Sequence, residues 1–102
     1  MNIMVFTTFS NKEEARRIAG ILLEEKAAAC VQLKEIESLY MWKGHIEEDR
    51  EVQGLIKTRR ELFGIVEEII KREHSYEVPQ IVAVDIESGS EAYLQWIGEV
   101  TR

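Results

Sequence analysis

The sequence predicts an α+β fold in which two helices cover one face of a four-stranded sheet. Two stretches place apolar residues at the i, i+3, i+4, i+7, i+8 spacing that gives a helix one buried stripe. Four other stretches are apolar or β-branched runs of the kind that forms strands. Their order is strand, helix, strand, strand, helix, strand, followed by a short terminal helix. With right-handed crossovers, this order produces the split βαβ sandwich known as ferredoxin-like.

The first strand is predicted at Ile3 to Thr8, an apolar and β-branched run. Ser10 and Glu13 then stand at the spacing of a capping box, so we expect the first helix to begin at Ser10. Its apolar stripe consists of Ala15, Ile18, Ala19, Leu22 and Leu23.

The middle of the chain predicts a long bent hairpin. No helical period is present from Ala28 to Lys57, and Lys43-Gly44 is placed as the turn between two strands. The acidic run of Glu47, Glu48 and Asp49 interrupts the second strand. We interpret this run as a loop or bulge between the turn and the returning strand.

The second half repeats the pattern of the first. Thr58 and Glu61 form another capping-box pair, which predicts that the second helix begins at Thr58. Its apolar stripe consists of Leu62, Ile65, Val66, Ile69 and Ile70. A fourth strand is predicted at Ile81 to Val84, and Ser88 with Glu91 predicts the start of the final helix.

Two of the predicted strands carry apolar residues at consecutive positions, in Ile3-Met4-Val5-Phe6 and Leu55-Ile56. Consecutive apolar positions indicate burial on both faces of a sheet. Two helices can cover only one face, so the other face must be covered by something else. We therefore expect self-association.

Composition limits the classes of function. The chain has 102 residues, 45% of them hydrophobic, and we expect a single domain spanning residues 1–102. Its net charge of −6 argues against nucleic acid as a partner, because phosphate binding requires a concentrated basic face. We expect no membrane span and no signal peptide, since no run reaches about 20 apolar residues and Met1 to Phe9 lacks a basic flank and a cleavage site.

The single cysteine, Cys30, excludes a disulfide framework or a zinc ribbon within the chain. It is consistent with a reducing compartment, so we expect a cytoplasmic protein. Catalysis is not expected. The chain has Thr7-Thr8-Phe9-Ser10 after its first strand, where acylphosphatases of this topology need a glycine-rich anion cradle and an arginine.

Several motifs resemble one known family over nearly the whole chain. They are Ala29-Cys30-Val31, Tyr40 with Trp42-Lys43-Gly44, Lys57-Thr58, His74 with Tyr76-Glu77-Val78-Pro79, and Tyr93 with Trp96. In order and spacing, they closely resemble the CutA divalent-cation-tolerance family. The resemblance implies a ferredoxin-like subunit that forms a tight homotrimer, similar in build to the trimeric PII signalling proteins, with roles in metal tolerance and copper binding. The chain departs from the family at Gln32, commonly asparagine, and at Ser75, commonly proline.

From this resemblance we predict a metal site at a cleft between subunits, for copper or another divalent cation. Its predicted ligands are Cys30, His74 and Glu77. Two alternatives remain open at this stage. Cys30 lies in an apolar segment, where a thiol often acts as a small buried hydrophobe. His74 ends the second helix, where a cation also interacts favourably with the helix dipole.

A second hypothesis is a PII-like cleft for a small anionic ligand. Lys57 and Arg59 are its cationic candidates, because they stand where a strand meets the predicted start of a helix. Glu51 and Tyr76 are also assigned to this cleft, and Glu51 and Glu77 are candidate carboxylate partners for Lys57. The large aromatic side chains of Tyr40 and Trp42 lie on the long hairpin, and we predict that they pack into the trimer interface.

Overall fold

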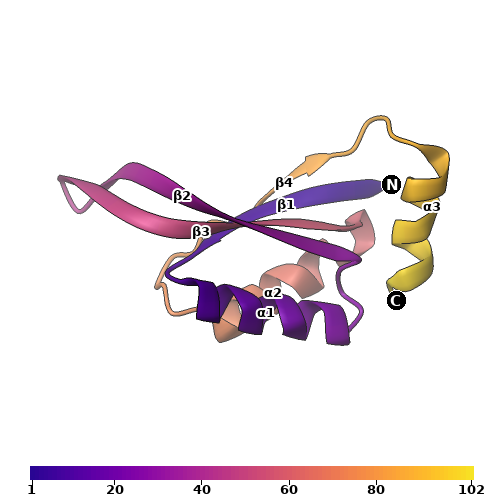
Figure 1. Ribbon diagram of the computed structural model, residues 1–102, viewed down its shortest axis with the longest axis horizontal. Coiled ribbons are helices and arrows are strands. Elements are labelled where there is room, and N and C mark those ends of the chain that lie inside the picture. Colours follow the sequence, from indigo (N-terminus) through magenta and orange to yellow (C-terminus); the bar gives the residue numbers. More distant parts are fainter.

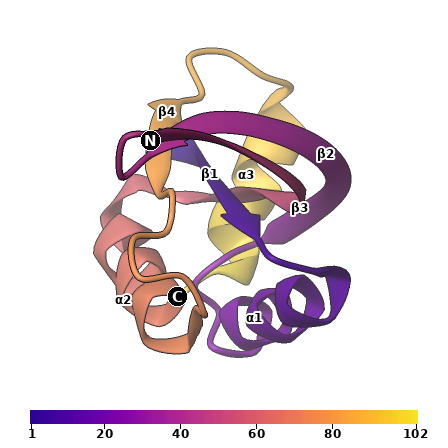
Figure 2. The ribbon, with the colours of Figure 1, turned by 90° about the vertical axis from the view of Figure 1, so that its left-hand side faces the viewer.

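The computed structural model describes residues 1–102 and confirms the predicted α+β fold and order of elements. The elements are β1 (Asn2–Phe9), α1 (Lys12–Glu24), β2 (Cys30–Trp42), β3 (His45–Arg59), a 3-10 turn (Arg60–Leu62), α2 (Phe63–Glu73), β4 (Val82–Asp85) and α3 (Glu91–Val100). The strands form one sheet in the order β2-β3-β1-β4, and all neighbouring strands are antiparallel. This is the ferredoxin-like arrangement, with α1 and α2 on one face (Figures 1 and 2).

The core lies between that face and the two helices. Burial alternates along β1, where Ile3, Val5 and Thr7 are fully covered while Met4 and Phe6 on the other face are only half-buried. The two helices contribute most of the predicted stripes, including Ile18, Leu22, Val66, Ile69 and Ile70. Leu23 was wrongly included in the stripe of α1, because its side chain is on the outer surface of the helix and is 43% exposed. Each such side chain contributes roughly 1.5–3 kcal/mol when it leaves water, so this layer holds the helices on the sheet.

The first helix begins one residue later than predicted. Asn11, not Ser10, is its N-cap, and the Asn11 side chain accepts a hydrogen bond of 2.8 Å from the backbone N–H of Glu14. Ser10 instead donates its N–H and its hydroxyl to the Glu14 carboxylate, at 3.2 Å each. The capping motif is therefore present but shifted, because Ser10 and Asn11 are both good caps and the chain uses the second.

The second predicted cap was wrong. Thr58 is the strand partner of Ile3, and its hydroxyl donates to the carbonyl of Ala27 at 2.6 Å. α2 starts only at Phe63, after the 3-10 turn and without a side-chain cap. Strand pairing with β1 thus prevailed over the local capping signal. The third cap was also misplaced, since Ser90 rather than Ser88 accepts the hydrogen bond that opens α3.

The long hairpin is confirmed. Lys43 and Gly44 both have positive φ, 49° and 82°, as expected for a two-residue hairpin turn. The acidic run is neither a loop nor a bulge, because Glu47, Glu48 and Asp49 lie within β3 in regular pairing with β2. Both faces of this part of the hairpin are open to water, so charged residues are tolerated in the strand.

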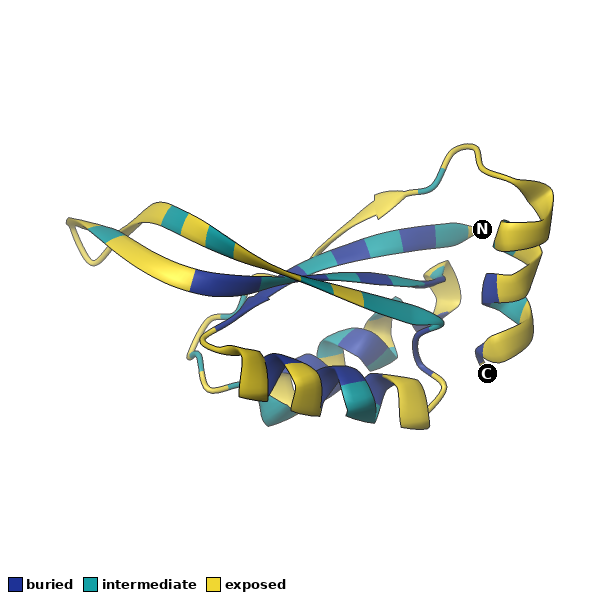
Figure 3. Cartoon of the chain, viewed as in Figure 1, coloured by how far each residue is buried: buried dark blue, intermediate teal, exposed yellow.

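The hairpin extends well beyond the rest of the sheet. β1 pairs with β3 only from Val52 onward, so β3 residues 45–51 are paired with β2 alone. This projection gives the molecule its longest extent of 44 Å (Figure 1). Figure 3 shows that most of the projecting part is exposed, and its apolar side chains include Leu39, Met41 and Ile46.

The sheet face opposite α1 and α2 is covered only at one end, where α3 contacts Lys57 and Arg59 of β3 (Figure 2). Val82 and Val84 of β4 are about half exposed there, beside Phe6 and Met4 of β1. α3 lies at the end of the sheet remote from the hairpin tip, where the Asn2 side chain donates to the carbonyl of Leu94 at 3.1 Å (Figure 1). No helix in the chain is long and apolar enough to cross a membrane.

Candidate functional site

A groove of about 740 Å³ lies where the projecting hairpin meets the loop after α2. We call it the hairpin groove. It is lined by Thr8, Glu37, Ser38, Leu39, Tyr40, Trp42, Glu51, Ser75, Tyr76, Glu77, Val78 and Gln80. Three of these side chains are carboxylates and three are aromatic, and none is basic.

His74 fixes the loop that forms one wall of the groove. Its Nδ1 accepts a hydrogen bond of 3.0 Å from the backbone N–H of Tyr76, so the proton lies on Nε2, which is 2.7 Å from the carbonyl oxygen of Thr8. The imidazole also stacks on Phe9, with ring centroids 5.5 Å apart. In one chain, therefore, both ring nitrogens of His74 are engaged by the backbone.

Glu14 of α1 holds the same loop from the other side. Its carboxylate accepts hydrogen bonds from the N–H of Ser75, at 3.0 Å, and from the N–H and hydroxyl of Ser10. Burial acts to raise the pKa of Glu14, but the hydrogen bonds from Ser75 and Ser10 outweigh it and leave the pKa below its usual value. The ionised carboxylate is thus the form that positions the loop.

Two tyrosine–carboxylate pairs face the hairpin groove or its rim. Tyr76 donates its hydroxyl to Glu51 Oε1 at 2.8 Å, and Glu51 is only 8% exposed. Burial raises the pKa of the Tyr76 phenol, and the hydrogen bond to Glu51 raises it further. Tyr40 donates to Asp49 across the hairpin, and this hydrogen bond raises the pKa of Tyr40 to about 12.

The predicted site residues fall into two groups at opposite ends of the sheet. Tyr40, Trp42, Glu51, Tyr76 and Glu77 all line the hairpin groove, and His74 lies directly behind its wall. The remaining three are at the end where α3 packs. They are Cys30, Lys57 and Arg59.

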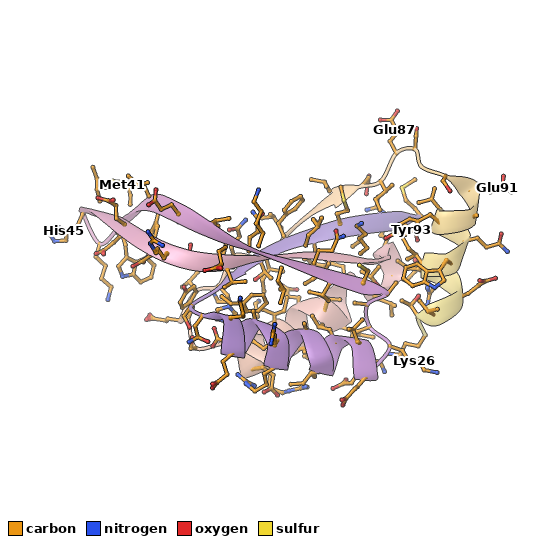
Figure 4. All side chains as sticks on the ribbon, viewed as in Figure 1. Lys26, Met41, His45, Glu87, Glu91 and Tyr93 are labelled. Carbon is orange, nitrogen blue, oxygen red and sulfur yellow. The ribbon has the colours of Figure 1, made fainter.

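At the α3 end, Cys30 is half-buried and is the strand partner of Lys57. The Lys57 ammonium donates to the Tyr93 hydroxyl at 3.2 Å and lies 5.2 Å from the centre of that ring. Figure 4 shows Tyr93 on α3, far from Met41 and His45 at the hairpin tip. The expected pairing of Lys57 with Glu51 is therefore not formed, because Glu51 is held by Tyr76 at the other end of the sheet.

Within one chain, no group of three or more His, Cys, Asp or Glu side chains is arranged to hold a metal ion. Cys30 lies at the α3 end, whereas His74 and Glu77 lie beside the hairpin groove. The predicted ligands thus come together only if different subunits supply them. The site between subunits stays a prediction.

Sequence reasoning missed several residues of the groove, among them Glu37 and Ser38 of β2, together with the positioning role of Glu14. A signal for Ser38 was available. A two-residue turn at Lys43-Gly44 fixes the register of the hairpin, which pairs Ile36 with Glu51, so Ser38, two residues further along β2, lies on the same face of the hairpin as Glu51. No local signal existed for Glu14, because its partner Ser75 is remote in sequence.

Comparison with known proteins gives a consistent assignment. The family model described as CutA1 divalent ion tolerance protein matches residues 3–100. The chain is 42% identical over 100 residues to the divalent-cation tolerance protein CutA of Pyrococcus horikoshii, covering 98% of each chain. A solved CutA structure from Archaeoglobus fulgidus, described as periplasmic, is 43% identical, with a TM-score of 0.96 over 98% of both chains. A divalent cation tolerance protein from Thermus thermophilus is 41% identical, with a TM-score of 0.96 over the whole of both chains. The chain belongs to the CutA1 divalent ion tolerance protein family.

Proposed function

We propose that the protein is a homotrimer that binds divalent cations, copper among them, and that it acts in cation tolerance without catalysing a reaction. Membership of a divalent ion tolerance family supports the class of ligand. The observation that supports self-association is the projecting hairpin, which exposes a set of large apolar side chains. They are Leu39, Tyr40, Met41, Trp42 and Ile46, between 39% and 73% exposed.

These exposed side chains are unfavourable on an isolated subunit, since large apolar groups gain free energy by leaving water. The backbone of β3 residues 45–51 also has no strand on the β1 side, so its N–H and C=O groups are available to a neighbouring chain. Packing the hairpin on another subunit would bury the apolar side chains and would also pair these backbone groups. Tyr40 and Trp42 are the aromatic anchors of that interface.

The cation site then lies between subunits. Copper favours nitrogen and sulfur donors, which Cys30 and His74 supply, and Glu77 adds a carboxylate. Because both nitrogens of His74 are engaged by backbone groups in the single chain, ligation would require it to release Thr8 or Tyr76. The half-buried thiol of Cys30 needs no such release.

The test is a calorimetric titration of chelator-stripped protein with Cu²⁺ and Zn²⁺. Saturable binding of one ion per subunit or per trimer is expected, and it should be lost in Cys30→Ala, His74→Ala or Glu77→Gln. His45→Ala is the matched control, because His45 is exposed beside the turn and outside the predicted ligand set. Weak binding of many ions, unchanged in the ligand variants, would contradict the metal site.

A cytoplasmic location is part of the proposal. The single Cys30 is a free thiol, which suits a reducing compartment. Subcellular fractionation with an antibody to the protein checks it. Recovery with the periplasmic or another oxidising fraction would contradict this part.

A second candidate function is a PII-like response to a small anion, and the surroundings of Lys57 favour it. The ammonium is held by the ring and hydroxyl of Tyr93 rather than by a carboxylate, so its charge is available to an anion. Nearby Arg59 is partly engaged by Thr101 and Glu61. Under this hypothesis Lys57→Gln abolishes anion binding and Cys30→Ala leaves it intact, and the reverse pattern would exclude it.

A further inference from the structure

β3 has a glycine in the middle of its core-facing side. Val52, Gly54 and Ile56 point to the same face of the sheet, and both neighbours of the glycine belong to the core. A glycine at such a position weakens a strand, because it adds no side chain to the core and loses more backbone entropy than other residues on folding. β3 is paired on both sides, with β2 and β1. A glycine there indicates that another group approaches the backbone closely.

The group that approaches Gly54 is the ring of Phe9. Phe9 is the strand partner of Val52, which makes Gly54 its diagonal neighbour on the same face. A methyl group at Gly54 would stand 2.8 Å from Phe9 Cε2 and 3.2 Å from Thr7 Cγ2. The first distance is well below the roughly 3.5–4.0 Å at which carbon atoms pack. The Phe9 ring therefore occupies the space that a side chain at Gly54 would need.

The same ring holds the imidazole of His74. The two rings are stacked, with centroids 5.5 Å apart and planes inclined by 12°. The carbonyl of Thr8, the residue before Phe9, lies 2.7 Å from His74 Nε2. Phe9 is fully buried, so its ring cannot move aside into water. A displacement of Phe9 therefore disturbs the stacking on His74 and also the hydrogen bond that His74 makes with the end of β1.

We propose that Gly54 is a positioning residue for His74, because the absence of a side chain at Gly54 gives Phe9 the space in which it orients the imidazole. In that orientation the Nε2 proton is directed to Thr8 and Nδ1 accepts from the backbone N–H of Tyr76. The consequence for cations rests on the proposed function. Gly54 and Phe9 keep His74 in the state in which its nitrogens bind the chain, and a metal ion must compete with that state.

The experiment records the imidazole nitrogen resonances of His74 and the amide exchange rate of Tyr76 in the assembled, chelator-treated protein. The native protein should show one tautomer, protonated at Nε2. Gly54→Ala should give a mixture of tautomers and should speed Tyr76 exchange at least about tenfold relative to the core amide of Val5. Ile56→Val is the matched control, because it loosens the same core face of β3. It should keep the native tautomer and change Tyr76 exchange less than about twofold.

Gly54 acts through the Phe9 ring, so its effect should vanish when that ring is removed. Phe9→Leu should itself speed Tyr76 exchange, and Gly54→Ala added to Phe9→Leu should change that rate less than about twofold. Equal acceleration by Gly54→Ala in both backgrounds would overturn the proposal, and so would an unchanged His74 tautomer in Gly54→Ala. If Gly54→Ala does not fold, the double variant decides. Its folding would identify the Phe9 ring as the obstacle, and its failure to fold would overturn the proposal.

A calorimetric titration of the same variants with Zn²⁺ separates this proposal from the proposed cation site. Loosening the imidazole makes it easier to release Thr8 or Tyr76, so Gly54→Ala should bind Zn²⁺ at least about threefold more tightly than the native protein. If the native protein binds Zn²⁺ through His74, equal or weaker binding by Gly54→Ala would overturn the proposal. If the native protein binds no Zn²⁺, or if His74→Ala binds it equally well, the predicted cation site is wrong. The tautomer and the exchange rate of the metal-free protein then still decide the role of Gly54.

Discussion

At the scale of single residues, two fully buried threonines differ in what their hydroxyl groups meet. Thr58 donates to the carbonyl of Ala27 at 2.6 Å. Thr7 has the same burial, but its Oγ1 has no hydrogen-bond partner. A buried hydroxyl without a partner is destabilising relative to a methyl group of the same size, whereas a bonded one stabilises.

We therefore expect opposite effects from the same substitution at these two sites. Thr7→Val should raise the free energy of unfolding by about 1 kcal/mol, and Thr58→Val should lower it by about 1–2 kcal/mol, since the Ala27 carbonyl then loses its donor. Urea unfolding followed by circular dichroism measures both. Destabilisation by Thr7→Val comparable to that at Thr58 would show that the Thr7 hydroxyl has a partner after all.

Glu14 makes the stability of the fold depend on pH. The pKa of Glu14 in the folded protein lies below the ordinary glutamate value of 4.5, so its contribution to stability is fully present above that pH and is lost as the pH falls through the folded pKa. Glu14→Gln should lower stability at pH 7 and flatten the acid limb of the stability curve. The control is Glu13→Gln, at an exposed position in the same helical turn. Parallel stability–pH curves for Glu14→Gln and the native chain would contradict this role.

At the scale of elements, the sequence was informative where the signal was local. The turn at Lys43-Gly44, most of the apolar stripes of α1 and α2, and the order of strands were all predictable. The start of α2 was not, because Thr58 is a sound helix cap locally and becomes a strand residue only through its pairing with β1 and its bond to Ala27. The position of the loop that forms the wall of the groove could not be predicted either. His74 and Glu14 fix it through contacts with Thr8, Ser10 and Ser75.

The turn gives a test of the hairpin itself. Gly44 has a φ of 82°, so Gly44→Ala should destabilise the protein by about 1 kcal/mol even though the added methyl group meets no atom within 4 Å. Gly20→Ala is the matched control, because Gly20 is in the middle of α1 with the same free space. Gly20→Ala should stabilise the protein by about 0.5–1 kcal/mol. Thermal unfolding compares the two, and a stabilising Gly44→Ala would contradict the assigned turn.

At the scale of the whole molecule, α1 and α2 cover one face of the sheet, α3 covers only one end of the other, and the hairpin carries its apolar side chains into solvent. Apolar residues at consecutive strand positions already indicated a second covered face. The sequence could not show which surfaces of neighbouring subunits contact each other, because that depends on how far the hairpin projects past β1. The predicted number of subunits comes from the family resemblance rather than from the pattern.

If the hairpin is the interface, charges at its tip should separate the subunits. Met41 and Ile46 are strand partners and are 66% and 73% exposed. The double variant Met41→Glu/Ile46→Glu should dissociate while keeping its circular dichroism spectrum, because neither side chain belongs to the core of the single chain. Leu23→Glu is the control, on the outer surface of α1. If the double variant and the native protein sediment equally, the hairpin is not part of the interface.

The central claim is that the chain completes its sheet and its cation site by forming a trimer. Its most direct test is the mass of the native, metal-free protein in solution, measured by light scattering across a concentration series. We predict a single species at three times the 11.8 kDa mass of one chain, stable to dilution into the low micromolar range. A species of 11.8 kDa at those concentrations would contradict the claim.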